Sequence, residues 1–488
     1  MPNLSCAPQR ISELFDPNDR SWRAKDVITA VEAVRRSLSV NFYMYDRNIP
    51  GGTDVAKEVA KIDKCIAAGL ASQLHELPQY SGEYWFVKSL LVHPWRVFRP
   101  AEAEILVVPV FLSFEHHRGC PGLTPAHKTL RAINQTGLLQ ARLRDHLYVA
   151  QDYRNNFAKL FPAGGVTRAF VEIIPANPNL HGKVVPRSPK QMDGREDFRL
   201  AVPYVDNSYM HGDWDSVPAY GTRRSHRNLT FFFGGSTVQN LPGSGLPGRK
   251  AAGYYIRHHL MRSWSRASPD ELPGTILVAS DSRFLRWMAV VRCDAAAKVG
   301  PNQSLARSPP PDAYGVKEGT RCLPACTDEL LAFGSAGACS GRYSAQQMLS
   351  RAIFGICTRG DVPTSPRPYD AIRHGAIPVI LGENVWALGM PFQCFVPYDL
   401  MTVSISERQL LRVDLAGLLR NVSASIDLMQ LSRMQELINH FSRDVLWFFR
   451  NVSSSRVAEN LLLEAARWRL RRPQGCCPLW DRSVDALI

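Results

Sequence analysis

Two successive series of strand patterns alternating with helical patterns constrain the fold of this chain more than any other feature. The first series predicts strands at 40–45, 104–110, 143–150, 168–174 and 198–204, and helices at 24–37, 53–76 and 83–93. The second predicts strands at 228–233, 275–280, 352–357 and 376–381, and helices at 251–264 and 345–351. Strands that alternate with helices are typical of α/β folds with parallel sheets. The run at 104–110 is continuously apolar, as in a strand buried on both faces.

A polar, glycine-containing stretch at 206–227 separates the two series. The chain has 488 residues, which is too long for one ordinary core. We therefore predict an α/β protein with two Rossmann-like lobes facing a cleft, preceded by a lead-in and followed by a helical segment that breaks near 451–455. The predicted domains are 1–38, 39–225, 226–425 and 426–488. A proline-rich stretch at 295–319 predicts a surface loop.

Composition and charge narrow the class of partner. Apolar residues make up 45% and charged residues 21%, which excludes a disordered or fibrous chain. No apolar run reaches the roughly 20 residues of a membrane span. The net charge of +14 suits a polyanion, a phosphate-bearing substrate or an anionic membrane surface. A mildly basic surface without a specific partner is the alternative. No nucleic-acid-binding pattern is present, so we predict no nucleic-acid partner.

The cysteines and the N-terminus bear on the compartment. Eleven cysteines and no C-x-x-C pair argue against a zinc ribbon and allow disulfides in an oxidising lumen. Six N-x-S/T sequons lean toward a secretory setting; they begin at Asn3, Asn134, Asn228, Asn302, Asn421 and Asn451. Residues 1–16 lack the apolar core of a signal peptide. The sequence thus fits a cytosolic chain or a lumenal portion without its anchor.

One segment, residues 352–381, combines the signals of a strand, a loop, a helix and a second strand. The first strand ends near Cys357, and a polar loop follows. Ser365 fits the N-cap of a helix, and Pro366 fits its first position. Gly375 fits the left-handed position that ends a helix, so the helix is expected to run to about His374.

The loop and the start of this helix carry side chains that suit a nucleotide diphosphate. Ligands of such units bind at the carboxyl ends of the strands, and a helix N-terminus offers N–H groups to a phosphate. Arg359 can bind a diphosphate through two N–H groups, and Thr364 and Ser365 add hydroxyls. Arg367 and Asp370 share a helix face, where a carboxylate can accept both hydroxyls of a ribose. An ordinary surface loop with a solvated Arg–Asp pair remains the alternative.

The same segment resembles the signature of the exostosin family of inverting glycosyltransferases. The matching residues are Phe354, Cys357, Arg359, Gly360, Ser365, Arg367, Tyr369, Asp370, Ala371, Ile372, Gly375, Ile377, Pro378 and Val379. Pro366 and Pro368 depart from the basic and aliphatic residues usual there. Residues 388–392 and Tyr398 are similar to later elements of the family.

The resemblance extends upstream in the order of the family, over about residues 40 to 410. The similar elements are 42–46, 98–109, 144–146 with Asp152, 197–203, 227–235 and 256–257. It implies the GT-B architecture, an inverting hexosyl- or pentosyltransferase, and a nucleotide-diphosphate sugar, expected to be a UDP-sugar, as donor. It implies a glycan or glycoprotein acceptor and no Asp-x-Asp metal site or other cofactor. It also implies the Golgi lumen, with membrane association through an anchor that this sequence does not show.

Two further sets of residues complete the predicted site. Under the family match, Arg257 joins Arg359, Gly360, Ser365, Arg367 and Asp370 in binding the donor. Asp145 and His146 are the candidate general base, because an inverting transfer needs a base on the acceptor side; a structural Asp–His pair is the alternative. The pair His116–His117 fits an exposed loop better than a metal site, and Tyr84, Trp85 and Trp95 fit the core.

A second class of function stays open from the sequence alone. A non-catalytic relative that binds a glycan or polyanion would keep the same fold. Retention of Arg359, Ser365, Arg367 and Asp370 favours the transferase.

Overall fold

The structure is a computed structural model of the chain. It describes residues 15, 19, 21–68, 81–116, 120–149, 167–170, 199–205, 227–235, 256, 257, 260, 274–279, 345–358, 365–382, 390–393, 395–406, 409, 414–447 and 454–470. The chain forms two compact units. Unit 1 comprises Met1–Val217, Ala387–Met401 and Glu436–Ile488, and unit 2 comprises Pro218–Trp386 and Thr402–Gln435. Unit 1 thus combines the predicted first lobe with the lead-in and most of the predicted C-terminal helical segment.

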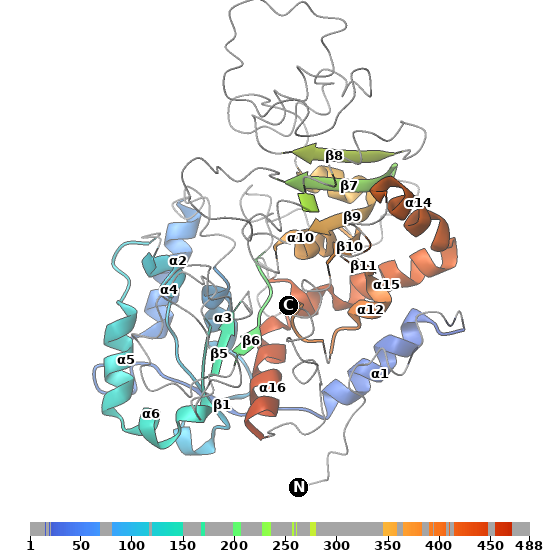
Figure 1. The fold of residues 1–488 in the computed structure, drawn as a ribbon. Coiled ribbons are helices and arrows are strands. Elements are labelled where there is room, and N and C mark those ends of the chain that lie inside the picture. The colour runs from blue at the N-terminus through green and yellow to red at the C-terminus, as the bar shows by residue number, and fades with distance from the viewer. Residues whose placement is uncertain are drawn as a thin grey trace, which may run out of the picture. The chain divides into compact units, whose positions relative to one another are not determined.

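Unit 1 is built on a six-stranded sheet in the order β2-β1-β3-β4-β5-β6. Figure 1 labels β1, β5 and β6 of this sheet. Every neighbouring pair is parallel. The strands are β1 (Phe42–Met44), β2 (Arg96–Val97), β3 (Ile105–Val107), β4 (His146–Val149), β5 (Thr167–Phe170) and β6 (Arg199–Ala201). All residues of β1, β3 and β4 are buried, as expected for parallel strands covered on both faces. The two-residue edge strand β2 was not predicted from the sequence.

Unit 1 also contains the helices that precede, separate and follow these strands along the chain. They are α1 (Ala24–Arg36), α2 (Val55–Ala67), α3 (Gly82–Leu90), α4 (Leu112–His116), α5 (Ala126–Gln135), α6 (Leu138–Ala141), α12 (Tyr398–Met401) and α16 (Val457–Leu470), with the 3₁₀ turns η3 (Pro100–Glu102) and η4 (Leu143–Asp145). The C-terminal helix α16 contacts α3, β3 and β6. Tyr84 and Trp85 on α3 are buried, which confirms their predicted place in the core. Helix α5 was not predicted.

Unit 2 is built on a five-stranded parallel sheet in the order β11-β10-β9-β7-β8 (Figure 1). The strands are β7 (Leu229–Gly235), β8 (Thr275–Ala279), β9 (Ala352–Thr358), β10 (Ile377–Leu381) and β11 (Val403–Ile405). Helices α9 (Ala345–Arg351) and α10 (Arg367–Arg373) contact β9, and α14 (Leu415–Ser425) follows β11 along the chain. Two parallel sheets in two units confirm the predicted fold class, α/β with two Rossmann-like lobes.

Of two further predictions, one differs from the observed elements and one is confirmed. The stretch 143–150 was expected to be one strand, but its first three residues form the turn η4, closed by a hydrogen bond from the His146 N–H to the Leu143 carbonyl. The stretch 426–471 forms α15 (Leu428–Val445) and α16, so the predicted break is confirmed. The predicted loop at 295–319 and most of the predicted helix at 251–264 lie outside the described residues. None of the described helices is both long and apolar enough to cross a membrane.

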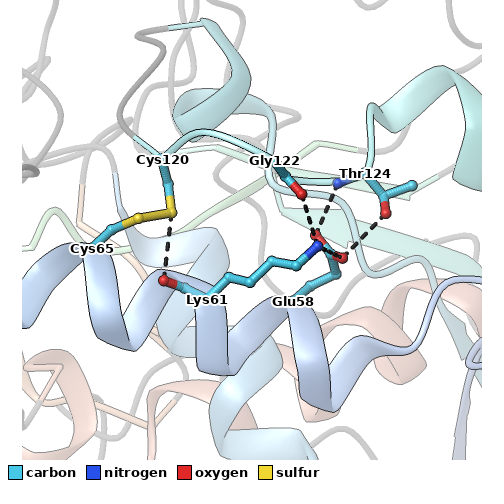
Figure 2. The surroundings of a disulfide bond; sticks show 6 residues. All are labelled: Glu58, Lys61, Cys65, Cys120, Gly122 and Thr124. Carbon is cyan, nitrogen blue, oxygen red and sulfur yellow. Dashed lines mark hydrogen bonds and ion pairs between the residues drawn. A yellow bond between two sulfur atoms is a disulfide. The ribbon is translucent and has the colours of Figure 1, made fainter.

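A disulfide joins helix α2 to the loop before α5, within unit 1. It links Cys65 to Cys120 across a sequence separation of 55 residues. Figure 2 shows a polar contact set beside it. Lys61 Nζ donates to Glu58 Oε1 at 2.8 Å and to the Gly122 carbonyl at 2.7 Å, and the Thr124 N–H donates to Glu58 Oε2 at 2.9 Å. The loop is therefore attached to α2 both covalently and by hydrogen bonds.

Candidate functional site

Three residues of the predicted donor site lie at the carboxyl edge of the unit 2 sheet. Strands β7 and β9 are neighbours, with Phe232 opposite Gly355, so both end at this edge. β10 also ends there, with Leu381 opposite Thr358. Arg257, Ser365 and Arg367 each hydrogen-bond to the end of one of these strands. Open parallel sheets bind ligands beyond the carboxyl ends of their strands.

Thr358, the last residue of β9, is a junction in this edge. Its side chain is fully buried, and its Oγ1 accepts a hydrogen bond of 3.0 Å from Arg257 Nε. Its backbone carbonyl accepts a hydrogen bond of 2.9 Å from Ser365 Oγ. Arg257 and Ser365 are 4% and 3% exposed, so both bonds lie in the protein interior. One residue thus fixes two predicted site residues from different parts of the chain.

The role of Ser365 differs from the predicted N-cap. Helix α10 begins at Arg367 with Pro366 in the cap position, and no side chain caps it. The Ser365 hydroxyl donates to the Thr358 carbonyl and so links the end of β9 to the residue two positions before α10. The C-terminal end of α10 matches the prediction, because His374 is the C-cap and Gly375 has a φ of +66°.

Arg367 lies against the end of β7. Its Nε donates to the Gly234 carbonyl at 3.2 Å, and its guanidinium carbon lies 5.5 Å from the centre of the Phe233 ring. A guanidinium over an aromatic face is stabilised by a cation–π interaction. Asp370 follows three residues later on the same helix. The structure therefore brings Arg257, Ser365 and Arg367 to one edge, with Asp370 in the first turn of α10. Arg359 and Gly360 lie outside the described residues.

Close packing of α10 on β9 positions these side chains. A Cβ added at Gly355 would lie 2.9 Å from the Ala371 Cβ, so only glycine lets the helix approach this closely. On β9, burial raises the pKa of the Cys357 thiol above its usual range. At pH 7 this thiol stays protonated, and it acts as a small apolar side chain of the core.

Arg227 fixes the opposite, amino-terminal edge of the same sheet. It is buried, and its guanidinium donates to the backbone carbonyls of Leu349, Ala352 and His374. Burial lowers its pKa to about 10, so it remains charged at neutral pH. The family element that begins at Arg227 thus corresponds to a structural residue here.

The predicted base, Asp145 and His146, lies in unit 1 at the amino-terminal edge of its sheet, because His146 is the first residue of β4. His146 is fully buried. Its Nδ1 lies 2.8 Å from the Arg142 carbonyl, so this nitrogen donates, and Nε2 then accepts from the Tyr45 hydroxyl at 2.7 Å. Arg142 Nε donates to Asp145 Oδ2 at 2.6 Å. These contacts favour the structural alternative, and the catalytic role of the pair stays a prediction.

Sequence reasoning missed the roles of Thr358 and Phe233. Both stand next to residues that the motif singled out, but their partners are 101 and 134 residues away along the chain, so no local spacing could reveal them. No three His, Cys, Asp or Glu side chains of the described part of the chain are grouped to hold a metal ion. The expectation that no metal is needed stays a prediction.

Part of the chain that includes this edge is similar to known proteins. Residues 300–422 match the model of the exostosin GT47 domain family. Three proteins of Oryza sativa subsp. japonica, each named a probable glucuronosyltransferase, are 26%, 28% and 27% identical over 127 residues. These matches cover 26% of this chain and 28%, 28% and 27% of the relatives, less than a third of their length.

Two solved structures are also similar. One is the GtfA/B complex, with 11% identity and a TM-score of 0.31 over 71% of this chain and 62% of that chain. The other is the spinosyn rhamnosyltransferase SpnG complexed with spinosyn aglycone, with 12% identity and a TM-score of 0.28 over 84% and 81%. Residues 300–422, which contain the signature segment, match the exostosin GT47 domain model, so the resemblance to the exostosin family of glycosyltransferases is confirmed.

Proposed function

We propose that this chain is a glycosyltransferase that binds a nucleotide-diphosphate sugar at the carboxyl edge of the unit 2 sheet. It transfers the sugar to a hydroxyl of a glycan or glycoprotein. The observation that carries the proposal is the junction at Thr358, which holds Arg257 and Ser365 beside Arg367 at this edge. Thr358, Ser365 and Arg367 lie inside the matched exostosin domain.

The proposed transfer inverts the anomeric carbon and needs no metal. The acceptor oxygen attacks opposite the diphosphate, on which negative charge grows as the glycosidic bond breaks. Fixed cations aimed at that charge stabilise the transition state, because they need no reorganisation during the reaction. Arg257 and Arg367, together with Arg359, supply these cations, and Asp370 accepts the ribose hydroxyls. A base on the acceptor side takes the proton of the attacking hydroxyl.

We propose a lumenal, Golgi-type setting for this activity. The Cys65–Cys120 disulfide supports it, because disulfides persist in oxidising compartments and are rare in the cytosol. The six sequons agree with the same setting. The names of the rice relatives make UDP-glucuronic acid the first donor to test, ahead of other UDP- and GDP-sugars.

Nucleotide titration tests the proposal directly. Calorimetry with UDP and GDP is expected to give micromolar binding of one of them by the wild-type protein, and weaker binding by Arg367→Ala. Arg99→Ala is the matched control, because Arg99 lies in unit 1 and its side chain is 80% exposed. A panel of nucleotide sugars then identifies the donor, with and without EDTA, and NMR of the product assigns its anomeric configuration. Absence of nucleotide binding, with retained binding of a sulfated glycan, would contradict the proposal.

A further inference from the structure

We infer that Thr358 is a positioning residue of the donor site, which orients the guanidinium of Arg257 toward the diphosphate. This inference rests on the proposed function. Thr358 ends β9, the strand between β7 and β10 in the sheet order. It touches no donor atom in this scheme and acts through Arg257.

The hydrogen bond from Arg257 Nε to Thr358 Oγ1 fixes how Arg257 can bind a ligand. Because Nε donates to Thr358 Oγ1 at 3.0 Å, this bond sets the orientation of the guanidinium that would hold a diphosphate. A free arginine side chain loses much rotamer entropy when it is ordered on a ligand. Thr358 orders the guanidinium beforehand, so less entropy is lost on binding.

The surroundings make Thr358 a rigid anchor. Its side chain is fully buried, and a β-branched residue in a strand has restricted χ1 rotamers. Its carbonyl also accepts the Ser365 hydroxyl, which attaches the start of the segment leading into α10 to the same residue. Among the described residues, the Thr358 hydroxyl contacts Arg257, and a substitution can remove this contact while keeping the shape of the side chain.

The test compares Thr358→Val with Thr358→Ser. Valine keeps the shape of the side chain but lacks the hydroxyl, whereas serine keeps the hydroxyl. Calorimetry with the nucleotide that the wild-type protein binds is expected to show roughly tenfold weaker binding by Thr358→Val, the scale of one hydrogen bond to a charged group. Binding by Thr358→Ser should stay within about twofold of the wild type, because serine keeps the hydroxyl that accepts the hydrogen bond from Arg257. In steady-state assays the donor KM should rise in Thr358→Val while the acceptor KM is unchanged.

A double-mutant cycle separates positioning from a loss of stability. In the Arg257→Ala background, Thr358→Val should cause no further loss of affinity, since residues that act through one contact are not additive. Thr358→Ala replaces the valine variant if the latter does not fold, as judged by its melting curve. Wild-type affinity in a folded Thr358→Val protein, or additive losses in the cycle, would overturn this inference alone. Failure of the wild-type protein to bind any nucleotide would instead overturn the proposed function, and the inference with it.

Discussion

At the residue scale, the buried ring of His146 connects three parts of unit 1. Nδ1 donates to the Arg142 carbonyl, Nε2 accepts from the Tyr45 hydroxyl, and the Tyr45 and His146 rings stack with centroids 5.6 Å apart. Burial lowers the pKa of His146 to about 4, and hydrogen bonds to the backbone oppose this only in part. Folding therefore favours the neutral imidazole.

A pH prediction follows from this shift. Because the folded pKa lies below the ordinary value near 6.5, the stabilising effect is complete above pH 6.5 and is lost as pH falls through 4. His146→Gln should remove part of the loss of melting temperature between pH 7 and pH 4, relative to the wild type. The exposed His127, changed to Gln, is the control and should leave that loss unchanged.

The same variant decides the role of His146 in catalysis. If His146 is structural, His146→Gln lowers the melting temperature, but the folded protein keeps most of its turnover rate at a temperature well below the transition. A base that takes part in the transfer typically contributes 10²–10⁴-fold to the rate. A drop of that size in kcat, with an unchanged donor Kd, would restore the catalytic role.

At the element scale, the contact of α10 with β9 depends on a single glycine. A Cβ at Gly355 would meet the Ala371 Cβ at 2.9 Å and the Leu349 Cδ2 at 3.2 Å. Gly355→Ala should therefore push α10 outward and lower stability by about 1–3 kcal/mol, the usual cost of overpacking. Since α10 carries Arg367, nucleotide affinity should fall as well, as measured by calorimetry.

Gly417 provides the control for this substitution. It lies in helix α14, where an added Cβ would have no neighbour closer than 3.7 Å. Gly417→Ala should stabilise the protein by up to about 1 kcal/mol, because alanine has the higher helix propensity. Equal effects of the two substitutions on the melting temperature would show that the helix–strand contact is not the cause.

At this scale, features set by neighbouring residues were predicted from the sequence, whereas contacts between residues far apart along the chain were not. The segment 352–381 was predicted to within a residue or two at most boundaries, because Gly375 and the apolar runs are local signals. The N-cap role of Ser365 was wrong, because its hydroxyl bonds to Thr358 rather than to the helix. The contact of His146 with Tyr45 and that of Arg257 with Thr358 could not be predicted, since the partners lie 101 residues apart along the chain.

At the scale of the whole molecule, the disulfide in unit 1 links folding to the redox compartment. Removing it by Cys65→Ser with Cys120→Ser should lower the stability of unit 1 by roughly 2–4 kcal/mol, as is typical for a native disulfide. The loop should keep its hydrogen bonds to Glu58 and Lys61, so the variant is expected to fold at a lower melting temperature (Figure 2). Non-reducing peptide mapping of protein expressed through the secretory pathway should recover Cys65 linked to Cys120. Free thiols at both positions would contradict the prediction.

Charge pairs also join the two ends of the chain within unit 1. Glu32 on α1 accepts hydrogen bonds from Arg443 and His440 on α15 and from Arg456 just before α16. Burial would raise the pKa of Glu32, but the hydrogen bonds from Arg456 and His440 outweigh it and lower that pKa to about 2. Next to this group, Arg35 forms a buried ion pair of 2.5 Å with Asp444.

Removal of α1 should therefore destabilise a region more than 400 residues away in sequence. A chain that starts at Leu38 lacks Arg35 and Glu32, and it leaves Asp444, which is fully buried, without its ion-pair partner. Breaking a buried pair in this way costs about 3–5 kcal/mol, because the remaining charge stays desolvated. A chain that starts at Phe15 keeps α1 and the contact of the Phe15 ring with Trp22, and it is the control, which should melt like the full chain. The point variant Glu32→Gln should show a smaller loss at pH 7, and this loss should shrink as pH falls from 4.5 toward 2, where the wild-type carboxylate is protonated. Equal melting temperatures of the two truncated chains would mean that α1 does not stabilise the C-terminal helices.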